Sequence, residues 1–527
     1  MSVPRTGGCD VALRAKIKYE LHHDPGVRMP ESRVSGLREK ALRGGVSKSL
    51  AQVVTFVVRI GSTAVLARML DPRDFGLVAM ATAMTGFLSL FRDAGLSLAT
   101  VQRASITHEQ LSTLFWLNVA VGVALTLLCV AAAPAIAHFY NDPRLFWVTA
   151  WTAPGFLLGA LSMQHNALLM REMRFSAFAA IDVASALAGA IVGIGMAYMG
   201  CGYWSLVGLS LATQAAVPVG AWVTTGWVPG KAHRNAEILS MVRLGGAVTL
   251  NNIVIYVAYN ADKILLGRYW GAETLGSYGR AYQLVSIPTD SVNSAVGSVA
   301  LSALSRVQGD AEKLKTYFLK GYAIVVALTI PGAVACGVFA EEIVAVLLGP
   351  KWGSAAEIVR LLAPTTAVFA LINPMFWLVF SAGLMARSVK IAVVIAILVI
   401  AAYAVGLPYG ARGVASAYSL AMLVWLVPHI YWCVYRTPVR PSDVLRSAAR
   451  PVVAGAITAL ACAGLKIYGL LPSLPLVRLI IGGAVLTALY LGILLYALGQ
   501  RGFYVDLVKT LLAKPAAPTS GVAQEFV

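Results

Sequence analysis

The sequence predicts an all-α polytopic membrane protein with about 14 transmembrane helices. The expected arrangement is two pseudo-repeated six-helix lobes around a central cavity, plus two C-terminal helices. The first observation behind this prediction is composition. The 527 residues have a mean hydropathy of +0.74, with 58% apolar and 13% charged residues, whereas soluble domains carry about 25% charged residues. The other two observations are apolar runs that recur along the chain and a weak repeat between its halves.

The apolar runs have the length of membrane-spanning helices. A helix needs about 20 apolar residues to cross the roughly 30 Å of hydrocarbon in a bilayer. The runs were divided at charged residues and at Pro/Gly-rich breaks. The expected spans are 47–69, 75–98, 112–133, 145–169, 176–199, 203–225, 244–261, 275–303, 318–340, 355–381, 388–407, 411–435, 450–469 and 476–498. The first, second, seventh and eighth are more polar than the others, as expected of helices that face a water-filled cavity.

The basic residues predict the orientation of the chain. Positively charged loops resist translocation, so they mark the cytoplasmic side. Most of the 42 Lys and Arg fall on the side of the N-terminus. The net charge of +18 is therefore explained by topology and does not indicate nucleic-acid binding. We expect a multi-pass protein of the bacterial inner membrane with both termini in the cytoplasm, and only short loops outside.

This orientation divides the chain into segments. Residues 1–45 are basic and lack the 7–15-residue apolar core of a signal peptide, so they are expected to stay in the cytoplasm, and no function is assigned to 1–28. The further expected segments are an N-terminal lobe at 46–226, a cytoplasmic linker at 227–243, a C-terminal lobe at 244–436, two additional helices at 437–500 and a cytoplasmic tail at 501–527.

The repeat appears at an offset of about 200 residues. Arg68 to Gly76 (RMLDPRDFG) aligns with Arg268 to Gly276 (RYWGAETLG), with Arg on Arg and Gly on Gly after the first and seventh spans. Later matches keep the same order, including Ile136–Tyr140 after span three and Ile343–Leu347 after span nine. Two parallel six-helix lobes that enclose a cleft suit transport by alternating access.

Several short segments resemble one family of transporters. Leu66 to Asn118 (LARMLDPRDFG…STLFWLN) resembles the first-lobe signature of Wzx-type polysaccharide exporters of the MOP superfamily. Four later stretches of this chain resemble second-lobe motifs of the same family. They begin at Asp262 (DKILLG), Leu275 (LGSYGRAY), Leu304 (LSR) and Leu348 (LGPKW). The resemblance covers about residues 36–500 and is greatest to the colanic acid and succinoglycan exporters.

This resemblance implies a function, a substrate and partners. The expected function is a flippase that moves undecaprenyl-diphosphate-linked oligosaccharide across the inner membrane for exopolysaccharide, lipopolysaccharide or capsule synthesis. The lipid bilayer surrounds such a protein, and glycosyltransferases and a polysaccharide polymerase of the same pathway are the expected partners. No catalytic residue and no nucleic-acid partner are expected. The resemblance also implies the fourteen-helix, two-lobed fold.

No cofactor or metal is expected. The six Cys and seven His are scattered, without CxxC or HExxH spacing, so neither a zinc site nor a disulfide framework follows. The sequence also lacks the GxxxxGK[ST] motif of ATP hydrolysis. Transport would therefore depend on a H⁺ or Na⁺ gradient, on the membrane potential or on consumption of the product.

Arginines inside the spans are candidate ligands of the diphosphate. A charge inside a span costs about 2.5–3.5 kcal/mol on insertion scales, and guanidinium binds phosphate oxygens bidentately. Arg59, Arg92 and Arg280 are assigned to the transport cavity. For Arg92, pairing with the next residue or reaching toward the interface is an open alternative. Arg280 and Arg360 lie nearer helix ends, where anchoring is the favoured role.

The acids form a complementary set. Asp93, Asp182 and Asp290 are candidates for ion coupling, since a carboxylate in a low-dielectric cavity can load a proton or hold Na⁺. Asp262 belongs to the same set. Structural ion pairs with the arginines remain open for all four. Trp270 and Trp352 lie at span ends, where an aromatic belt explains them, with sugar stacking as the alternative.

Two other functions remain as alternatives. A cation-coupled multidrug antiporter of the MATE type would share the fold, but it would need acids to dominate the cavity. A polyprenyl-dependent glycosyltransferase or polysaccharide polymerase would need catalytic residues on a sizeable outer loop, and the predicted outer loops are short. Arginine is at least as prominent as aspartate in the predicted spans, which favours an anionic cargo.

Overall fold

The structure is a computed structural model that describes residues 31–93, 100, 106–232, 238–502 and 504. Every regular element in this part of the chain is a helix, which confirms the all-α fold class. The described residues contain 11 stretches that are long and apolar enough to cross a bilayer, and one of them, Met385–Val434, contains two α-helices. The exact number of spans and the lobe boundaries stay predictions, and residues 1–28 lie outside the described residues.

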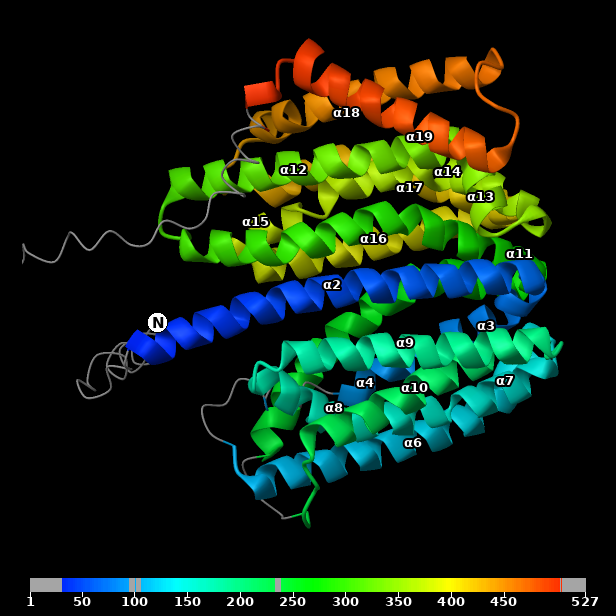
Figure 1. Ribbon diagram of the computed structural model, residues 1–527, viewed down its shortest axis with the longest axis vertical. Coiled ribbons are helices and arrows are strands. Elements are labelled where there is room, and N and C mark those ends of the chain that lie inside the picture. Colours follow the sequence, from blue (N-terminus) through cyan, green and yellow to red (C-terminus); the bar gives the residue numbers. More distant parts are fainter. Residues whose placement is uncertain (1–30, 94–99, 101–105, 233–237, 503, 505–527) are drawn as a thin grey trace, which may run out of the picture.

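The helices form two groups (Figure 1). The N-terminal bundle contains α2 (Glu31–Met69), α3 (Pro72–Thr85), η1 (Gly86–Leu88), α4 (Ser89–Asp93), α6 (His108–Tyr140), α7 (Arg144–Thr152), α8 (Pro154–Arg171), α9 (Phe175–Tyr198) and α10 (Trp204–Thr225). The C-terminal bundle contains α11 (Ile238–Arg306), α12 (Ala311–Val338), α13 (Ala340–Leu347), η2 (Pro350–Trp352), α14 (Gly353–Ile372), α15 (Met375–Ser381), α16 (Met385–Gly406), η3 (Leu407–Tyr409) and α17 (Gly410–Val434). Beyond it lie α18 (Pro441–Ile467), α19 (Pro475–Gly492) and η4 (Ile493–Ala497).

The first and last long helices place both ends of the described chain on one side. In Figure 1 the start of α2 lies at the same end of the molecule as the end of α19. The helix α2 runs between the two bundles and packs on α9, while α3 packs on α11. This arrangement agrees with an even number of crossings. Which side is cytoplasmic stays a prediction.

Local sequence signals set several helix ends. Thr107 and Gln110 form a capping box at the start of α6, where each side chain accepts the other residue's backbone N–H at 3.2 Å. Proline divides two of the expected spans, because it cannot supply a backbone N–H to a continuing helix. Pro154 separates α8 from α7, and Pro374 separates α15 from α14.

A single glycine joins the two arms of α11. Gly271 has φ 78°, a left-handed conformation that costs glycine little and other residues more. It reverses the chain between a first arm that ends at Trp270 and a second arm that begins at Ala272. The sequence predicted these arms as separate spans at 244–261 and 275–303, and the first arm is longer than predicted.

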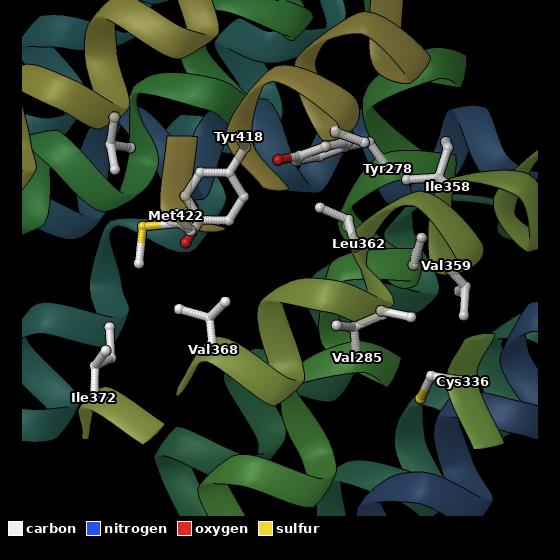
Figure 2. Close-up of a cluster of buried hydrophobic side chains, with 14 of the residues drawn as sticks. Tyr278, Val285, Cys336, Ile358, Val359, Leu362, Val368, Ile372, Tyr418 and Met422 are labelled. Atoms are coloured by element: carbon white, nitrogen blue, oxygen red, sulfur yellow. The ribbon is translucent and has the colours of Figure 1, made fainter. Parts of the chain in front are cut away.

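The C-terminal bundle has a core of tightly packed side chains. Figure 2 shows Tyr278 and Val285 of α11 beside Leu362 of α14 and Tyr418 of α17, and all four are buried. In the apolar 18-residue segment within Pro350–Ser381, 67% of the residues are buried, which is the highest buried share among the candidate spans. The helix α14 is therefore central in this bundle, and the other helices surround it.

One aromatic expectation is wrong. Trp352 was expected at the membrane interface, but its side chain is fully buried and its indole N–H donates to the carbonyl of Ala67 at 2.8 Å. Trp270 is partly exposed and donates to the carbonyl of Leu407 at 2.8 Å. Both indoles thus join helix ends, and Trp352 joins the two bundles.

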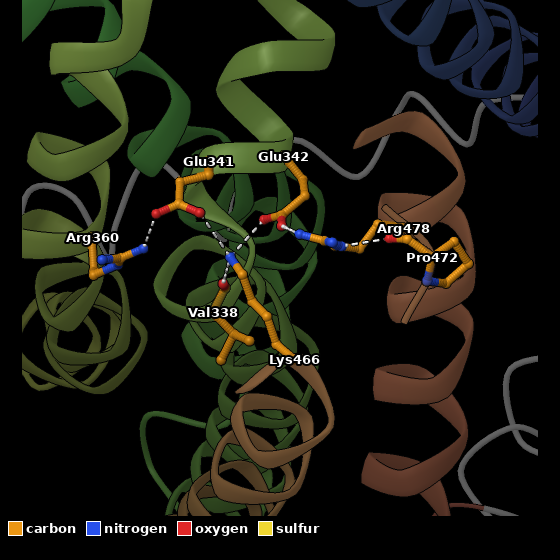
Figure 3. Close-up of polar contacts among 7 residues, drawn as sticks. All are labelled: Val338, Glu341, Glu342, Arg360, Lys466, Pro472 and Arg478. Atoms are coloured by element: carbon orange, nitrogen blue, oxygen red, sulfur yellow. Dashed lines mark hydrogen bonds and ion pairs between the residues drawn. The ribbon is translucent and has the colours of Figure 1, made fainter. Parts of the chain in front are cut away.

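A network of charged side chains attaches α18 and α19 to the C-terminal bundle (Figure 3). Glu342 is only 3% exposed, and its carboxylate accepts from Lys466 at 3.0 Å and from Arg478 at 3.2 Å. Glu341 accepts from Arg360 at 2.8 Å and from Lys466 at 3.2 Å. These hydrogen bonds lower the pKa of Glu341, and the one from Arg360 has the largest effect. Arg360 therefore has the anchoring role expected for it.

Removing the buried carboxylate should destabilise the protein. We expect Glu342→Gln to cost about 2 kcal/mol, because Lys466 and Arg478 lose their partner in a partly buried site. The matched control is Glu357→Gln, which breaks an exposed pair with Arg412 and should cost about 0–1 kcal/mol. Thermal unfolding of the two variants in detergent measures the difference, and equal midpoints would contradict the role of the network.

Candidate functional site

Two glycines bring the bundles into backbone contact. A Cβ on Gly76 of α3 would lie 1.7 Å from the carbonyl oxygen of Ala272, and a Cβ on Gly276 of α11 would lie 1.8 Å from that of Pro72. No side chain fits at either position. We call this contact the glycine crossing. It joins the two segments that align at the offset of 200, so the repeat in the sequence is a contact in space.

The arginines of the repeated segments bind the opposite bundles. Arg68, at the end of α2, donates to the carbonyl of Val346 at 2.7 Å. Arg268, at the related position of α11, donates to the side-chain oxygen of Asn141 at 2.9 Å, with the Asn141 amide oriented to satisfy both of its neighbours. Each arginine thus reaches the segment that follows the third expected span of the other bundle, α6 in one and α12 in the other. The two contacts are related by the repeat.

A further ion pair closes the same end of the molecule. Lys351 of η2 pairs with Asp71, just before α3, at 2.8 Å. Trp352 adds the hydrogen bond to Ala67 described above, and its ring meets that of Phe75 edge-on at 5.2 Å. Together with the glycine crossing, these contacts hold the bundles together where α2 ends and α3 begins.

A cavity lies next to the crossing, between α3 and the two arms of α11. Its volume is about 280 Å³, near the lower limit of about 300 Å³ for ligand pockets. Its polar lining residues are Thr82, Tyr256, Asn260, Lys263, Arg280 and Gln283. Among the described residues, no Asp or Glu lines it. The cavity is therefore positively charged and suited to an anionic group.

The two cations of the cavity have neutral partners. Lys263 Nζ donates to Asn260 Oδ1 at 2.8 Å. Arg280 Nη1 donates to Gln283 Oε1 at 2.5 Å, and its guanidinium lies 4.4 Å from the centre of the Phe75 ring. In the described part of the chain, neither forms a salt bridge. The buried carboxylate of Asp262 offsets part of the Lys263 charge, whereas Arg280 has only neutral partners among the described residues, which leaves its guanidinium available for phosphate oxygens.

Tyr256 connects the bundles a second time. Its hydroxyl lies 3.2 Å from the carbonyl oxygens of both Thr82 and Ala83. The helix α3 ends there and η1 begins at Gly86, where a Cβ would lie 2.2 Å from the Tyr256 hydroxyl. The cavity thus lies between two contacts, the glycine crossing and Tyr256. A bulky ligand cannot enter until the bundles separate.

The structure places one of the three predicted substrate-binding arginines in this cavity. Arg280 also lines a smaller cavity against Ile60, Thr63 and Ala64 of α2. Arg59 is exposed on α2, one residue before this second cavity begins. Arg92 lies elsewhere, inside the N-terminal bundle, where its guanidinium contacts Gly159 of α8.

The predicted acids are not gathered at the cavity. Asp182 of α9 and Asp290 of α11 are exposed and do not line it. The side chain of Asp93 lies outside the described residues. Asp262 is buried in the C-terminal bundle, where its Oδ1 accepts the backbone N–H of Lys263 at 2.8 Å. Roles for these acids in ion coupling stay predictions.

Sequence reasoning missed Lys263 and its neighbours Tyr256 and Asn260. The seventh span was predicted to end at residue 261, so Lys263 counted as part of a loop. The available signal was the DKILLG motif, which was noted as a family resemblance without a role for its lysine. The first arm of α11 continues to Trp270, and this places Lys263 in the cavity.

Comparison with known proteins gives a consistent result. A family model described as polysaccharide biosynthesis protein matches residues 65–357. The lipopolysaccharide biosynthesis protein WzxC of Escherichia coli K12 is 26% identical over 395 residues, 74% of this chain and 80% of that protein. The succinoglycan biosynthesis transport protein ExoT of Rhizobium meliloti is 24% identical over 481 residues, 90% of this chain and 96% of that protein.

Solved structures share the fold. A lipid II flippase, MurJ, in an inward closed conformation, superposes with a TM-score of 0.68 over 88% of this chain and 100% of that chain, at 13% identity. An inward-facing MATE multidrug resistance transporter of the MOP superfamily gives 0.59 over 74% of this chain and 96% of that chain, at 14% identity. At these identities the likeness establishes the fold alone.

The glycine crossing should not tolerate a side chain. We expect Gly76→Ala to separate the bundles, because the added methyl group would overlap the carbonyl of Ala272. Spin labels at Arg73→Cys and Glu273→Cys, with accessible native cysteines replaced, should then show a population at longer distance. Gly279→Ala is the matched control, since nothing lies within 4 Å of a Cβ there. Unchanged distances in Gly76→Ala would contradict the crossing.

Proposed function

The chain belongs to the polysaccharide biosynthesis protein family, and from this membership we propose that it is a flippase for undecaprenyl-diphosphate-linked oligosaccharide. Its related proteins WzxC and ExoT are named for lipopolysaccharide biosynthesis and succinoglycan transport. It is a transporter and not an enzyme. The translocated oligosaccharide units would supply exopolysaccharide, lipopolysaccharide or capsule synthesis at the inner membrane.

The charge of the inter-bundle cavity carries this proposal. A diphosphate presents several anionic oxygens, and the planar fork of Arg280 can bind two of them at once. Lys263 adds a second cation on the neighbouring arm of α11, and the nearby carboxylate of Asp262 does not line the cavity. Thr82, Asn260 and Gln283 offer polar groups for further phosphate or sugar oxygens. The same cavity would repel a cationic drug.

Opening and closing of the bundles would move the cargo. We infer that the end closed by the glycine crossing faces the periplasm, because the basic start of α2 lies at the opposite end. The cargo would enter from the cytoplasmic leaflet, and the crossing would then open. Alternating access of this kind needs rigid bundles that rock about a binding site between them. The C-terminal core and the helix packing provide such rigidity.

The energy source and the partners belong to the proposal as well. Asp93, Asp182 and Asp290 are our candidates for coupling to H⁺ or Na⁺, and the membrane potential is the alternative. Glycosyltransferases would build the lipid-linked unit on the cytoplasmic side. A polysaccharide polymerase would consume it outside, which would draw the transport forward. No bound cofactor is needed for any of these steps.

Loss of the cavity charge should impair export. In a strain that lacks the gene, we expect mass spectrometry to show accumulation of undecaprenyl-diphosphate-linked oligosaccharide, which the wild-type gene removes. With the Arg280→Ala gene, the strain should export at least about tenfold less lipid-linked oligosaccharide than with the wild-type gene. The change removes a charge-assisted hydrogen bond worth about 1.5–3 kcal/mol. Arg280→Lys should fall between the two, since it keeps the charge and loses the fork. Arg59→Ala tests the predicted role of Arg59 in the same assay.

The control for this experiment is Arg412→Ala. Arg412 is an exposed arginine paired with Glu357, distant in sequence from the cavity and not among its lining residues. It should export like wild type. Absence of any accumulated lipid-linked glycan in the deletion strain, with heightened sensitivity to cationic drugs, would overturn the flippase proposal and favour the MATE-type alternative.

A further inference from the structure

A second basic cavity lies outside the inter-bundle site. The helices α12 and α18 pack against each other, and their first turns enclose a cavity of about 640 Å³. This cavity lies at the end of the molecule where α2 begins, opposite the glycine crossing (Figure 1). Its charged lining residues are Glu312, Lys315, Lys320, Arg446 and Arg450. Four cations and one acid thus converge from two helices.

Among the described residues, most of this positive charge has no acidic partner. Lys315 pairs with Asp443 at 2.8 Å. In the described part of the chain, Lys320, Arg446 and Arg450 form no salt bridge. The other end of α18 is different, because Lys466 there contacts both Glu341 and Glu342. The excess of cations is therefore specific to one end of the helix.

The surface below the cations is apolar and exposed. Arg446 and Arg450 are followed on the same face of α18 by Val453, Ile457 and Leu460, at the three- and four-residue spacing of one helix face. These three side chains are 45%, 45% and 76% exposed. From Arg450 to Leu460 the helix rises about 15 Å, which is half of the roughly 30 Å hydrocarbon thickness. The stripe is as long as one leaflet.

The neighbouring helix repeats this order of groups. On α12, Lys320 lines the cavity, and Leu328, two turns further, is 58% exposed. The excess of basic residues in cytoplasmic loops explains why cations lie at this end of the molecule. It does not explain why they converge on one cavity above an exposed apolar stripe. Cations at the interface with apolar side chains below them match the phosphate and acyl chains of a lipid.

We propose that this cavity binds the phosphate of an anionic phospholipid from the leaflet on this side of the membrane. Basic pockets between transmembrane helices on the cytoplasmic side are suited to anionic headgroups, and each nearby Lys or Arg contributes about 1 kcal/mol. Lys320, Arg446 and Arg450 hold the phosphate, and the acyl chains follow Val453 and Ile457. The bound lipid fastens α18 to α12, so it stabilises the folded protein.

The test compares lipids on the purified full-length protein in detergent. Native mass spectrometry measures bound phosphatidylglycerol against phosphatidylcholine. We expect wild type to retain phosphatidylglycerol preferentially and to unfold at a higher temperature when it is present. The triple variant Lys320→Gln, Arg446→Gln, Arg450→Gln should bind it about a hundredfold more weakly, because about 1 kcal/mol is lost for each of the three cations.

A matched triple variant controls for net charge. Lys313→Gln, Lys390→Gln and Arg440→Gln remove three exposed cations from the same end of the molecule, outside the cavity, and should bind like wild type. Equal binding by the two triple variants, or equal retention of both lipids by wild type, would overturn the proposal. Competition with inorganic diphosphate distinguishes a site for free phosphate from a site for a lipid. If the diphosphate displaces phosphatidylglycerol at equal concentration, the lipid assignment is wrong.

Discussion

The contact between the backbones of α3 and α11 at Gly76 and Gly276 is the constraint on which the rest of the molecule depends. Because neither position has room for a Cβ, the two bundles approach closely at one end and diverge from it. The cavity with Lys263 and Arg280 exists because α11 folds back at Gly271 and lays both arms beside α3. The paired contacts of Arg68 and Arg268 then follow from the repeat, since each bundle presents the same segment to the other.

Charge is used in three different ways along the long axis of the helices. At the end with the glycine crossing, carboxylates and cations neutralise each other, and Glu342 joins α13 to α18 and α19. In the inter-bundle cavity, two cations are held by neutral amides and an aromatic ring, so their fields reach into the space between the bundles. At the opposite end, the cations of α12 and α18 face an open cavity. A transporter of an anionic cargo needs this separation, because acids close to the cavity would cancel its charge.

The sequence was sufficient for the fold class and for part of the site. Apolar runs report helices directly. The match between Arg68–Gly76 and Arg268–Gly276 predicted repeated lobes, but not that the two segments touch. Arg280 could be predicted because a charge in an apolar run is costly. Lys263 could not be predicted, because hydropathy places the end of the helix where charged residues begin. In the structure the first arm of α11 continues past Lys263 to Trp270. Arg92 shows the reverse error: an arginine in a span can lie inside one bundle, and only the tertiary structure tells which face it occupies.

Translocation by the purified protein in liposomes tests the central claim most directly. Asp71 and Lys351 lie on opposite bundles and form an ion pair beside the glycine crossing, so Asp71→Cys and Lys351→Cys can be joined by a short cleavable thiol reagent. We predict that the free protein transfers undecaprenyl-diphosphate-linked oligosaccharide between leaflets, that bridging the two cysteines stops transfer, and that reduction restores it. Transfer by the bridged protein at the rate of the unbridged one would contradict the account.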